Sequence, residues 1–383
     1  MLYLFLILAA ALSAEPVDRH KSEITVHEWG TFTSVAGRQG DAEAWSPLSG
    51  PDDLPCFVKR IRFPFSKLSL SGRVRMETPV LYFYSPLAAE VSVAVKFPHG
   101  LITEWYPDAK VKTPAIGQPI ELETAGGGIE WNRVRILPQG PAEFPVEPGL
   151  SHYYAARRTE ANPVAVDIDG AHTQQDRFLF YRGAGGFDPP VSVTASEPEV
   201  RIRAIGPDRI PALILFENRD GRIGFRVQGA FRGSITLPRP KLDADLDAVL
   251  SSLRGALLAG GLFPQEAQAM IETWRDAWFE EGSRLLYIVP PAFVDSELPL
   301  SLNPAPAQLV RVFVGRAEFL TPDIARSIEG ALKTRDRGVL ARYGRFAAPH
   351  VLSLMPGLTA LEQSFGYEAL SDLFRKPGQC PIQ

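Results

Sequence analysis

The sequence predicts a mainly β, multi-domain protein with one or two β-sandwich-like modules, followed by a helix-rich α+β C-terminal unit. Residues 24–240 contain short segments rich in β-branched and aromatic residues and bounded by Pro or Gly, as strands are. After Leu242 the apolar residues recur at helical spacing. Proline accounts for 34 of 383 residues, about 9% against about 5% in average proteins, and it is costly inside helices and central strands. This composition favours short strands joined by fixed turns.

Each expected strand is short and ends at turn residues. The strongest local signal is a hairpin over Ala212–Val227, in which Asp220-Gly221 lies between two apolar runs. The other strands expected before residue 240 are Thr78–Tyr84, Glu90–Phe97, Leu101–Tyr106, Ile129–Leu137, Arg177–Tyr181, Val191–Ala195 and Val200–Ile205.

A weak internal repeat indicates how these strands could be grouped. The string LYFYSP (81–86) resembles FLFYRG (178–183), each is followed by VSV, and the copies lie about 100 residues apart. This offset fits two tandem β-sandwich modules, over 24–150 and 151–240. The alternative is a chance similarity between two aromatic strands.

The C-terminal unit is expected over 242–383, after a Pro-rich linker at 237–240. Asp243 or Asp245 can cap a first helix, which Gly260-Gly261 ends. The elements expected after it are a helix from Pro264 with Trp274 and Trp278 on its core-facing stripe, strands at Leu285–Val289 and Leu309–Val314, and a helix from Thr321.

The N-terminus is typical of a signal peptide over residues 1–14, cleaved near residues 13–14. Leu2–Ala14 is an apolar run of about 13 residues, too short for a bilayer core of about 30 Å, and a charged stretch follows it. No Lys or Arg precedes the run, so a buried N-terminal helix or strand is the alternative. We expect an exported chain, periplasmic or secreted, that is soluble and has no membrane span after cleavage.

The charge and the cysteine content limit the kinds of binding partner and of cellular compartment that we expect. The formal net charge is -4 and no Lys/Arg-rich block occurs, which argues against a nucleic-acid partner. The two cysteines, Cys56 and Cys380, could pair in an oxidising compartment and tie the C-terminal tail to the first domain. The alternative is two unrelated thiols.

Glutamate–tryptophan pairs are the most unusual local pattern. On a strand the two neighbours face opposite sides, so the tryptophans can enter the core while the glutamates face solvent. Alternatively the pairs cluster in one cleft, where aromatic faces and carboxylates suit a sugar and two carboxylates about 5–9 Å apart can hydrolyse a glycosidic bond. The three pairs are Glu28-Trp29, Glu104-Trp105 and Glu130-Trp131.

His27 beside Glu28 invites a metal hypothesis, but the helical zinc motif needs a second His where Thr31 stands. We therefore predict neither a metal site nor a cofactor. Arg157 and Arg158 can form a fork on a carboxylate, sulfate or phosphate, or make surface or interdomain salt bridges. No G-x-S-x-G or S-x-x-K motif occurs, so the sequence leaves open whether the protein is an enzyme.

Four longer strings resemble a group of exported bacterial proteins that has no assigned activity. The resemblance implies a bacterial envelope or secreted location and one recurrent multi-domain architecture, and it carries no catalytic role. The strings are VHEWGTFTS (26–34), HYYAARRTEANPV (152–164), RFLFYRGAGGF (177–187) and RVFVGRAEFLTP (311–322).

The favoured hypothesis is an exported binding or interaction protein that recognises a glycan or another envelope component from strand ends and loops. One alternative is an exported, glycosidase-like hydrolase with Glu28 and Glu104 as acid and base, or with His27 as base; another is a purely structural envelope protein. The binding hypothesis expects these residues to converge on one hollow: His27, Glu28, Trp29, Glu104, Trp105, Glu130, Arg157 and Arg158.

Overall fold

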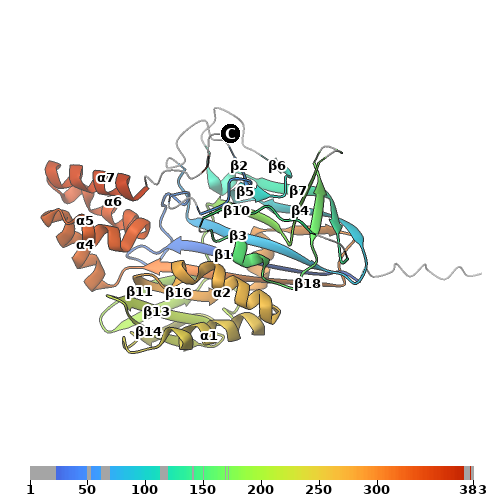
Figure 1. The fold of residues 1–383 in the computed structure, drawn as a ribbon. Helices are drawn as coiled ribbons and strands as arrows, with labels where there is room; N and C mark the ends of the chain where they lie inside the picture. Colours follow the sequence, from blue (N-terminus) through green and yellow to red (C-terminus); the bar gives the residue numbers. More distant parts are fainter. Residues whose placement is uncertain are drawn as a thin grey trace, which may run out of the picture.

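The computed structural model describes residues 23–49, 53–61, 70–112, 120–139, 142–149, 151–168, 170, 172–374 and 380. The predicted signal peptide at residues 1–14 lies outside them. The described chain is mainly β, with several sheets and a helical C-terminal region at one end (Figure 1). Among its helices, none combines the length and hydrophobicity that crossing a bilayer requires.

A nine-stranded sheet forms the centre of the molecule. Its middle strand, β1 (Thr25–Val35), pairs in parallel with β18 (Gln308–Phe319) and antiparallel with β3 (Val74–Tyr84). The full order is β14 (Arg222–Gln228), β13 (Leu213–Arg219), β16 (Gly282–Ile288), β18, β1, β3, β10 (Leu179–Gly185), β5 (Gly100–Tyr106) and β2 (Lys59–Arg60).

Two smaller sheets contribute side chains to one hydrophobic cluster together with the central sheet. Phe83 comes from the central sheet, Trp131 from the six-stranded sheet and Ile202 from the three-stranded sheet. The six-stranded sheet contains β17 (Leu300–Asn303), β4 (Ala89–Phe97), β7 (Gly127–Ile136), β8 (Val164–Asp167) and β9 (Thr173–Asp176), with β6 (Lys110–Lys112) beside β7. The three-stranded sheet contains β11 (Val191–Ala195), β12 (Glu199–Ala204) and β15 (Ser234–Pro238).

The strands do not follow the predicted domain ranges, because the central sheet takes strands from all three of them: 24–150, 151–240 and 242–383. The two similar strings lie in adjacent strands, where Leu81 of β3 is opposite Leu179 of β10. They are therefore neighbours in one sheet and not equivalent strands of two tandem modules.

The predicted hairpin is confirmed as β13 and β14, joined at Asp220-Gly221. Both turn residues have positive φ, 52° for Asp220 and 75° for Gly221, as a two-residue turn that matches the strand twist requires. Glycine adopts this conformation without a steric penalty, and aspartate tolerates it better than most residues do.

Two helices cover one face of the central sheet. They are α1 (Leu246–Ala259) and α2 (Pro264–Trp278), and the carboxylate of Asp245 caps α1 by accepting the Asp247 N–H. Trp274 and Trp278 are 2% and 0% exposed and pack into the cluster that also contains Trp29, as the core-facing stripe predicts.

The C-terminal helices form a unit with its own hydrophobic cluster. The 3-10 helix η4 (Gly344–Ala347) packs the Phe346 ring near Trp45, which follows the end of β1. The remaining helices are α3 (Pro291–Glu297), α4 (Pro322–Thr334), α5 (Arg337–Tyr343), α6 (Ala348–Leu354) and α7 (Ala360–Phe374), with short turns η2 (Leu122–Thr124), η3 (Tyr154–Arg157) and η5 (Met355–Gly357).

Cys56 and Cys380 form a disulfide with their Cα atoms 5.3 Å apart. The pairing that the sequence left open is therefore formed, and it joins positions 324 residues apart. Such a bond restricts the unfolded chain strongly because it closes a very long loop.

Replacement of Cys380 by Ser is expected to lower the free energy of unfolding by about 2–5 kcal/mol, because the unfolded chain regains the entropy of the open loop. The shift of the variant's urea midpoint of unfolding, relative to the oxidised wild type, measures this loss of free energy. The Cys56→Ser/Cys380→Ser double variant is the control and is expected to lose a similar amount. An unchanged midpoint in both variants would contradict the stabilising role.

Candidate functional site

The alternation of side chains along β1 separates the residues of its predicted motif. His27 faces α2, where its Nδ1 lies 2.8 Å from Glu266 Oε2, and it is fully buried. Glu28 faces the opposite side of the sheet, where Oε1 accepts the Tyr181 hydroxyl at 2.5 Å and Oε2 accepts Arg311 Nε at 2.6 Å. The two side chains therefore cannot act together on one ligand.

The other two glutamate–tryptophan pairs lie on different sheets. Glu104 is on β5 of the central sheet, 7% exposed, and accepts a hydrogen bond from Thr103. Its neighbour Trp105 donates to Asp108 Oδ1 at 3.3 Å. Glu130 is on β7, exposed and 3.7 Å from Lys110 Nζ, whereas Trp131 next to it is buried.

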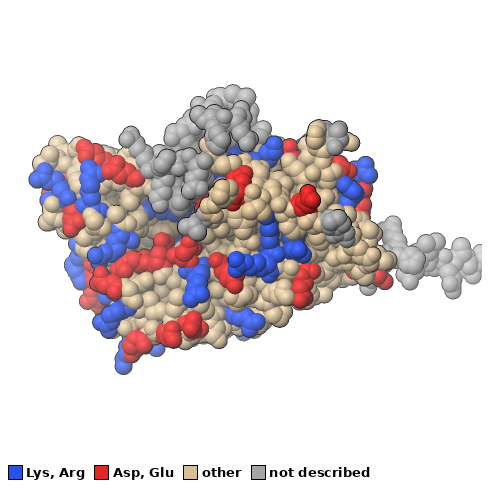
Figure 2. Space-filling view, viewed as in Figure 1, with Lys and Arg blue, Asp and Glu red and all other residues tan. Residues whose placement is uncertain are grey.

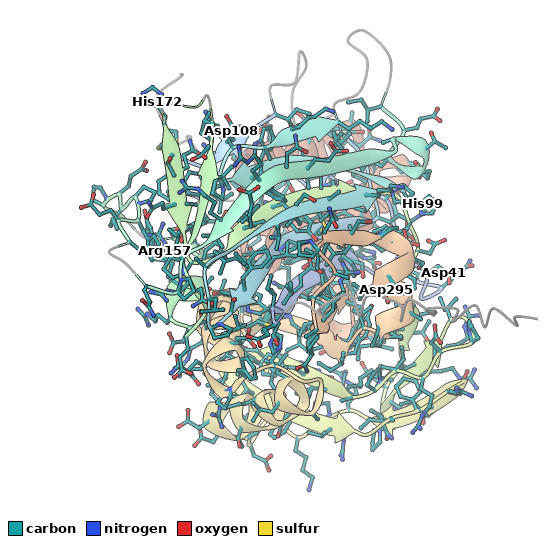
Figure 3. All side chains as sticks on the ribbon, turned by 90° about the vertical axis from the view of Figure 1, so that its right-hand side faces the viewer. Asp41, His99, Asp108, Arg157, His172 and Asp295 are labelled. Carbon is teal, nitrogen blue, oxygen red and sulfur yellow. A yellow bond between two sulfur atoms is a disulfide. The ribbon has the colours of Figure 1, made fainter. Side chains whose placement is uncertain are left out.

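The two arginines after the Tyr-Tyr pair are also separate. Arg157 forks onto Asp176 through Nε at 2.8 Å and Nη2 at 2.7 Å, and its guanidinium lies over the Tyr153 ring. Arg158 is exposed and donates to Glu272 at 2.6 Å. Figure 3 shows Arg157 on one side of this end of the molecule and Asp295, the second partner of Arg311, on the other.

The expectation that these eight residues converge on one hollow is therefore wrong. The period of two along a strand sends neighbours to opposite faces, and the three pairs lie on two sheets. Trp29 and Trp131 lie in two different hydrophobic clusters. The interpretation with tryptophans in the core and glutamates facing solvent holds for Glu130-Trp131 alone of the three pairs, because Glu28 and Glu104 are both buried.

A cleft of about 280 Å³ lies where the central sheet meets the C-terminal helices, and we call it the arginine cleft. In Figure 2 charged groups of both signs interleave over the visible face of the molecule. The polar and aromatic residues that line the arginine cleft are Asp53, Arg75, Glu77, His152, Trp274, Glu280, Arg316, Arg342, Tyr343, Arg345 and Phe346.

Glu77 on β3 is the buried anion of the arginine cleft. Its carboxylate accepts the Thr33 hydroxyl at 2.7 Å and Arg345 Nη2 at 3.2 Å, and it lies 3.1 Å from Arg75 Nε. Burial alone would raise the pKa of Glu77, but Arg345 and Arg75 outweigh it and lower that pKa to about 2. The carboxylate therefore stays ionised although it is only 3% exposed.

The arginines around Glu77 crowd one another. Burial and, after it, the charge of Arg182 lower the pKa of Arg75 to about 10, although Glu77 acts in the opposite direction. Arg316 on β18 binds Glu318 and Glu280, each at 2.6 Å, and its guanidinium lies 4.6 Å from the centre of the Phe346 ring. The site is therefore a dense ion network with strong positive character around Arg75.

A second group of charged residues reaches the lining of the arginine cleft through Asp53 and His152. Arg182 on β10 forks onto Asp53 at 2.8 and 3.1 Å, and Asp53 also bonds His152 Nδ1 at 2.7 Å. His152 Nε2 lies 2.8 Å from Asp276. Burial alone would lower the pKa of His152, but the hydrogen bonds and charges of the two aspartates raise it above its ordinary value.

Two buried donors on the described part of the lining make no aligned hydrogen bond. Trp274 Nε1 has none, and Arg75 Nε is near Glu77 without an aligned hydrogen bond. Trp274 is 2% exposed and Arg75 6%. Buried polar groups usually find partners, so these two donors are exceptions on this lining.

A backbone irregularity in β3 determines the face of the sheet to which Glu77 projects. Thr78 has a φ of 49°, which is strained for a β-branched residue, and the pairing of β1 with β3 shifts register beside it. Arg182 Nη2 contacts Thr78 Oγ1 at 3.4 Å. The bulge lets Glu77 and Val80 project to the same face, although they are three residues apart.

The sequence contains a signal for this site in residues that were not among the predicted ones. Two strands interrupt an apolar pattern with Arg-x-Glu, as Arg75-x-Glu77 and as Arg316-x-Glu318. Residues two apart on a strand share a face, so each pattern places opposite charges side by side. Because β3 and β18 both flank β1, the two patterns meet across that strand.

A second hollow of about 430 Å³ lies beside the segment after β1, lined by Arg38, Asp41 and His350 among others. Arg38 pairs there with Glu329, which is not part of the lining, and both side chains are largely exposed, at 66% and 37%. Among the described residues, no group of three or more His, Cys, Asp or Glu side chains is placed to share a metal ion. The arginine cleft is therefore the stronger candidate.

No protein-family model matches this chain, and no curated protein matches it. Among solved structures it is similar to a yeast delta-COP-I mu-homology domain complexed with a Dsl1 WxWxV peptide, at 7% identity and a TM-score of 0.30, over 79% of this chain and 99% of that one. The peptide-free yeast domain matches at 7% identity and a TM-score of 0.28, over 79% and 98%. Similarity at this level supports no conclusion about fold or ligand.

Replacement of Glu77 by Gln is expected to lower the free energy of unfolding by about 3–5 kcal/mol, because it leaves the buried Arg75 and the half-buried Arg345 without their anion. Urea denaturation measures the change. The matched control is Glu90→Gln, which removes an exposed pair with Arg133 and is expected to cost less than about 1 kcal/mol. Equal losses in the two variants would show that the buried network does not stabilise the fold.

His152→Asn is expected to destabilise the protein in a pH-dependent way. A raised histidine pKa stabilises the fold below the unfolded value of about 6.5, and this contribution disappears as pH rises through the folded value. The stability difference between wild type and variant is thus largest at about pH 4–6.5, above the ordinary aspartate pKa, and shrinks at higher pH. Chemical denaturation at pH 5.5 and pH 9 measures it, and a constant difference would contradict a charged His152.

Proposed function

We propose that this chain is an exported binding protein whose arginine cleft takes a ligand with an oxyanion group, such as an acidic glycan or another acidic envelope component. The signal-like N-terminus supports export, as does the resemblance of the four strings to a group of exported bacterial proteins. The disulfide supports it too, because disulfides persist in oxidising compartments. We take the body to be β-sandwich-like, since its sheets share a hydrophobic cluster.

The observation that carries this proposal is the donor-rich lining of the arginine cleft. Among the described residues of the lining, two buried donors make no aligned hydrogen bond: Trp274 Nε1, and Arg75 Nε, which lies 3.1 Å from Glu77. An oxyanion presents several acceptor lone pairs and a negative charge, so it satisfies both donors and compensates Arg75. Guanidinium groups suit this role because they bind carboxylate, phosphate or sulfate through two parallel hydrogen bonds.

The geometry supports binding better than hydrolysis. A glycosidase needs one carboxylic acid that stays protonated, but arginines hold the pKa of both Glu77 and Asp53 below their ordinary values. Glu28, the acid or base of the alternative hypothesis, is fully buried. Among the described residues that line the arginine cleft, none is a Ser, Thr or Cys that could act as nucleophile.

Arg345 connects the proposed ligand site to the helical unit. It sits on η4, donates to the Ser49 carbonyl at 2.6 Å and to Glu77, and its guanidinium lies over the Trp45 and Phe346 rings. An anion in the cleft would add a further acceptor beside this cation. The affinity should therefore depend on Arg345 more than on any cation outside the cleft.

Titration calorimetry at low salt with glucuronate, inorganic phosphate and sulfate is expected to detect binding of at least one of them, weakened by added salt. Arg345→Gln is expected to weaken it about tenfold or more, since a charged hydrogen bond contributes roughly 1.5–3 kcal/mol. Arg345→Lys should weaken it less.

The matched control is Arg326→Gln, which removes an exposed cation paired with Glu197 and should leave the affinity unchanged. Circular dichroism checks that each variant is folded. Absence of binding by every probe at millimolar concentration would refute the proposal and favour the purely structural role. Equal losses in the Arg345 and Arg326 variants would place the binding outside the cleft.

A further inference from the structure

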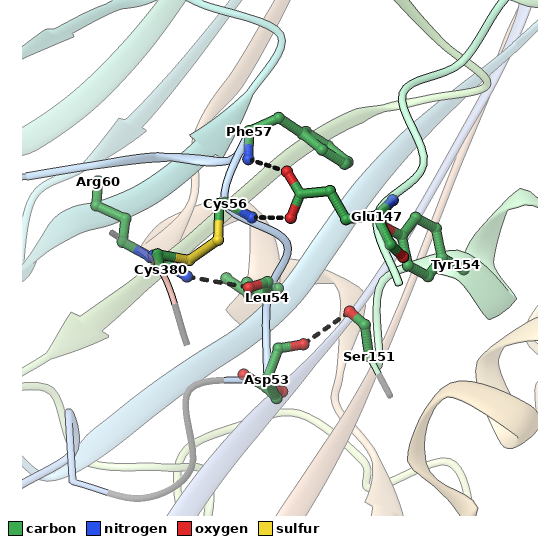
Figure 4. Close-up of a disulfide and its surroundings, with 9 residues drawn as sticks. All are labelled: Asp53, Leu54, Cys56, Phe57, Arg60, Glu147, Ser151, Tyr154 and Cys380. Carbon is green, nitrogen blue, oxygen red and sulfur yellow. Dashed lines mark hydrogen bonds between the residues drawn. A yellow bond between two sulfur atoms is a disulfide. The ribbon is translucent and has the colours of Figure 1, made fainter. Parts of the chain in front are cut away.

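The two sulfur atoms of the disulfide have different electrostatic surroundings (Figure 4). Arg60 Nη1 lies 3.1 Å from Cys380 Sγ, and its Nη2 donates to the Leu54 carbonyl at 3.1 Å. The guanidinium is thus anchored against one sulfur of the bond. Both cysteines are partly exposed.

The other cysteine lies beside a carboxylate. Glu147 accepts the backbone N–H of Cys56 at 2.7 Å and that of Phe57 at 3.1 Å. The backbone N–H of Glu147 donates to the Tyr154 hydroxyl at 2.9 Å, which fixes the segment that carries the carboxylate. A negative charge is therefore held close to Cys56, just as a positive charge is held close to Cys380.

These charges have opposite effects on the thiolates that opening of the bond would produce. A neighbouring cation stabilises a thiolate and lowers the thiol pKa, whereas a neighbouring carboxylate does the reverse. In thiol–disulfide exchange the sulfur that forms the more stable thiolate leaves faster. Arg60 therefore favours Cys380 as the leaving sulfur, and Glu147 disfavours Cys56 in that role.

We propose that Cys56 is a site of reversible S-thiolation by small-molecule thiols. The thiol first loses its proton, and its thiolate attacks Cys56 Sγ. The new S–S bond forms on Cys56 as the bond to Cys380 breaks, and the electron pair leaves with Cys380 as a thiolate beside Arg60. The oxidation level does not change in this step, and the Cys380 thiolate takes up a proton from water. A second small-molecule thiol then attacks the mixed disulfide. This step restores the Cys56 thiol and releases a disulfide of the two small molecules.

The exchange frees the C-terminal end of the chain from the segment that carries Cys56. Asp53 lies three residues before Cys56 and holds Arg182 and His152 at the arginine cleft. Leu373, near the end of α7, lines the same cleft. The bond therefore joins two segments that border the arginine cleft, but the proposed modification does not depend on what the cleft binds.

The test treats the oxidised full-length chain with a limiting amount of 2-mercaptoethanol, quenches with iodoacetamide and maps the peptides by mass spectrometry. The adduct is expected on Cys56 and the carbamidomethyl group on Cys380, with a preference of about tenfold over the reverse. Arg60→Gln should slow the exchange severalfold and reduce this preference. Arg60→Lys keeps a cation and should retain most of it.

The matched control is Arg133→Gln, which removes an exposed cation on β7, and it should match the wild type in rate and preference. An adduct found mainly on Cys380, or equally on both cysteines, in the wild type would overturn the proposal. So would a folded Arg60→Gln variant that reacts as the wild type does. The adduct position in the wild type decides the matter even where a variant does not fold.

Discussion

The burial of Glu77 among arginines is the interaction on which this part of the structure depends. A carboxylate removed from water is tolerated only where cations and donors replace its hydration. Thr33, Arg75 and Arg345 do so here, from β1, β3 and η4. Three parts of the chain that are distant in sequence are therefore held in one place, and the helical unit is fixed to the end of the sheet.

The arginine cleft lies on the face of β1 that is next to the Glu77 network. The change of side chains along this face explains the position of the cleft. At one end of that face, α2 covers His27 and Trp29 with apolar and hydrogen-bonding groups. At the other end the strand carries Thr31 and Thr33, opposite Glu77 and Arg75 of β3. Charged side chains pack less completely than apolar ones do, because their polar atoms require partners at fixed geometry. The arginine cleft lies at this polar end.

The disulfide and the arginine cleft are parts of one arrangement. Asp53 lines the cleft three residues before Cys56, and Glu147 binds the backbone at Cys56. The bond therefore lies next to the wall of the cleft, although its two cysteines are 324 residues apart. Chemistry at the bond and binding in the cleft are distinct properties that share this segment of the chain.

The sequence by itself determined the local elements. The hairpin at Asp220-Gly221, the cap at Asp245 and the stripe of Trp274 and Trp278 follow from turn chemistry and periodicity, which act over a few residues. Only the tertiary structure decided that β1 lies in parallel beside β18, that the cysteines pair, and that two Arg-x-Glu patterns meet across β1. Strand pairing and desolvation of charge depend on contacts hundreds of residues apart, so local patterns do not specify them.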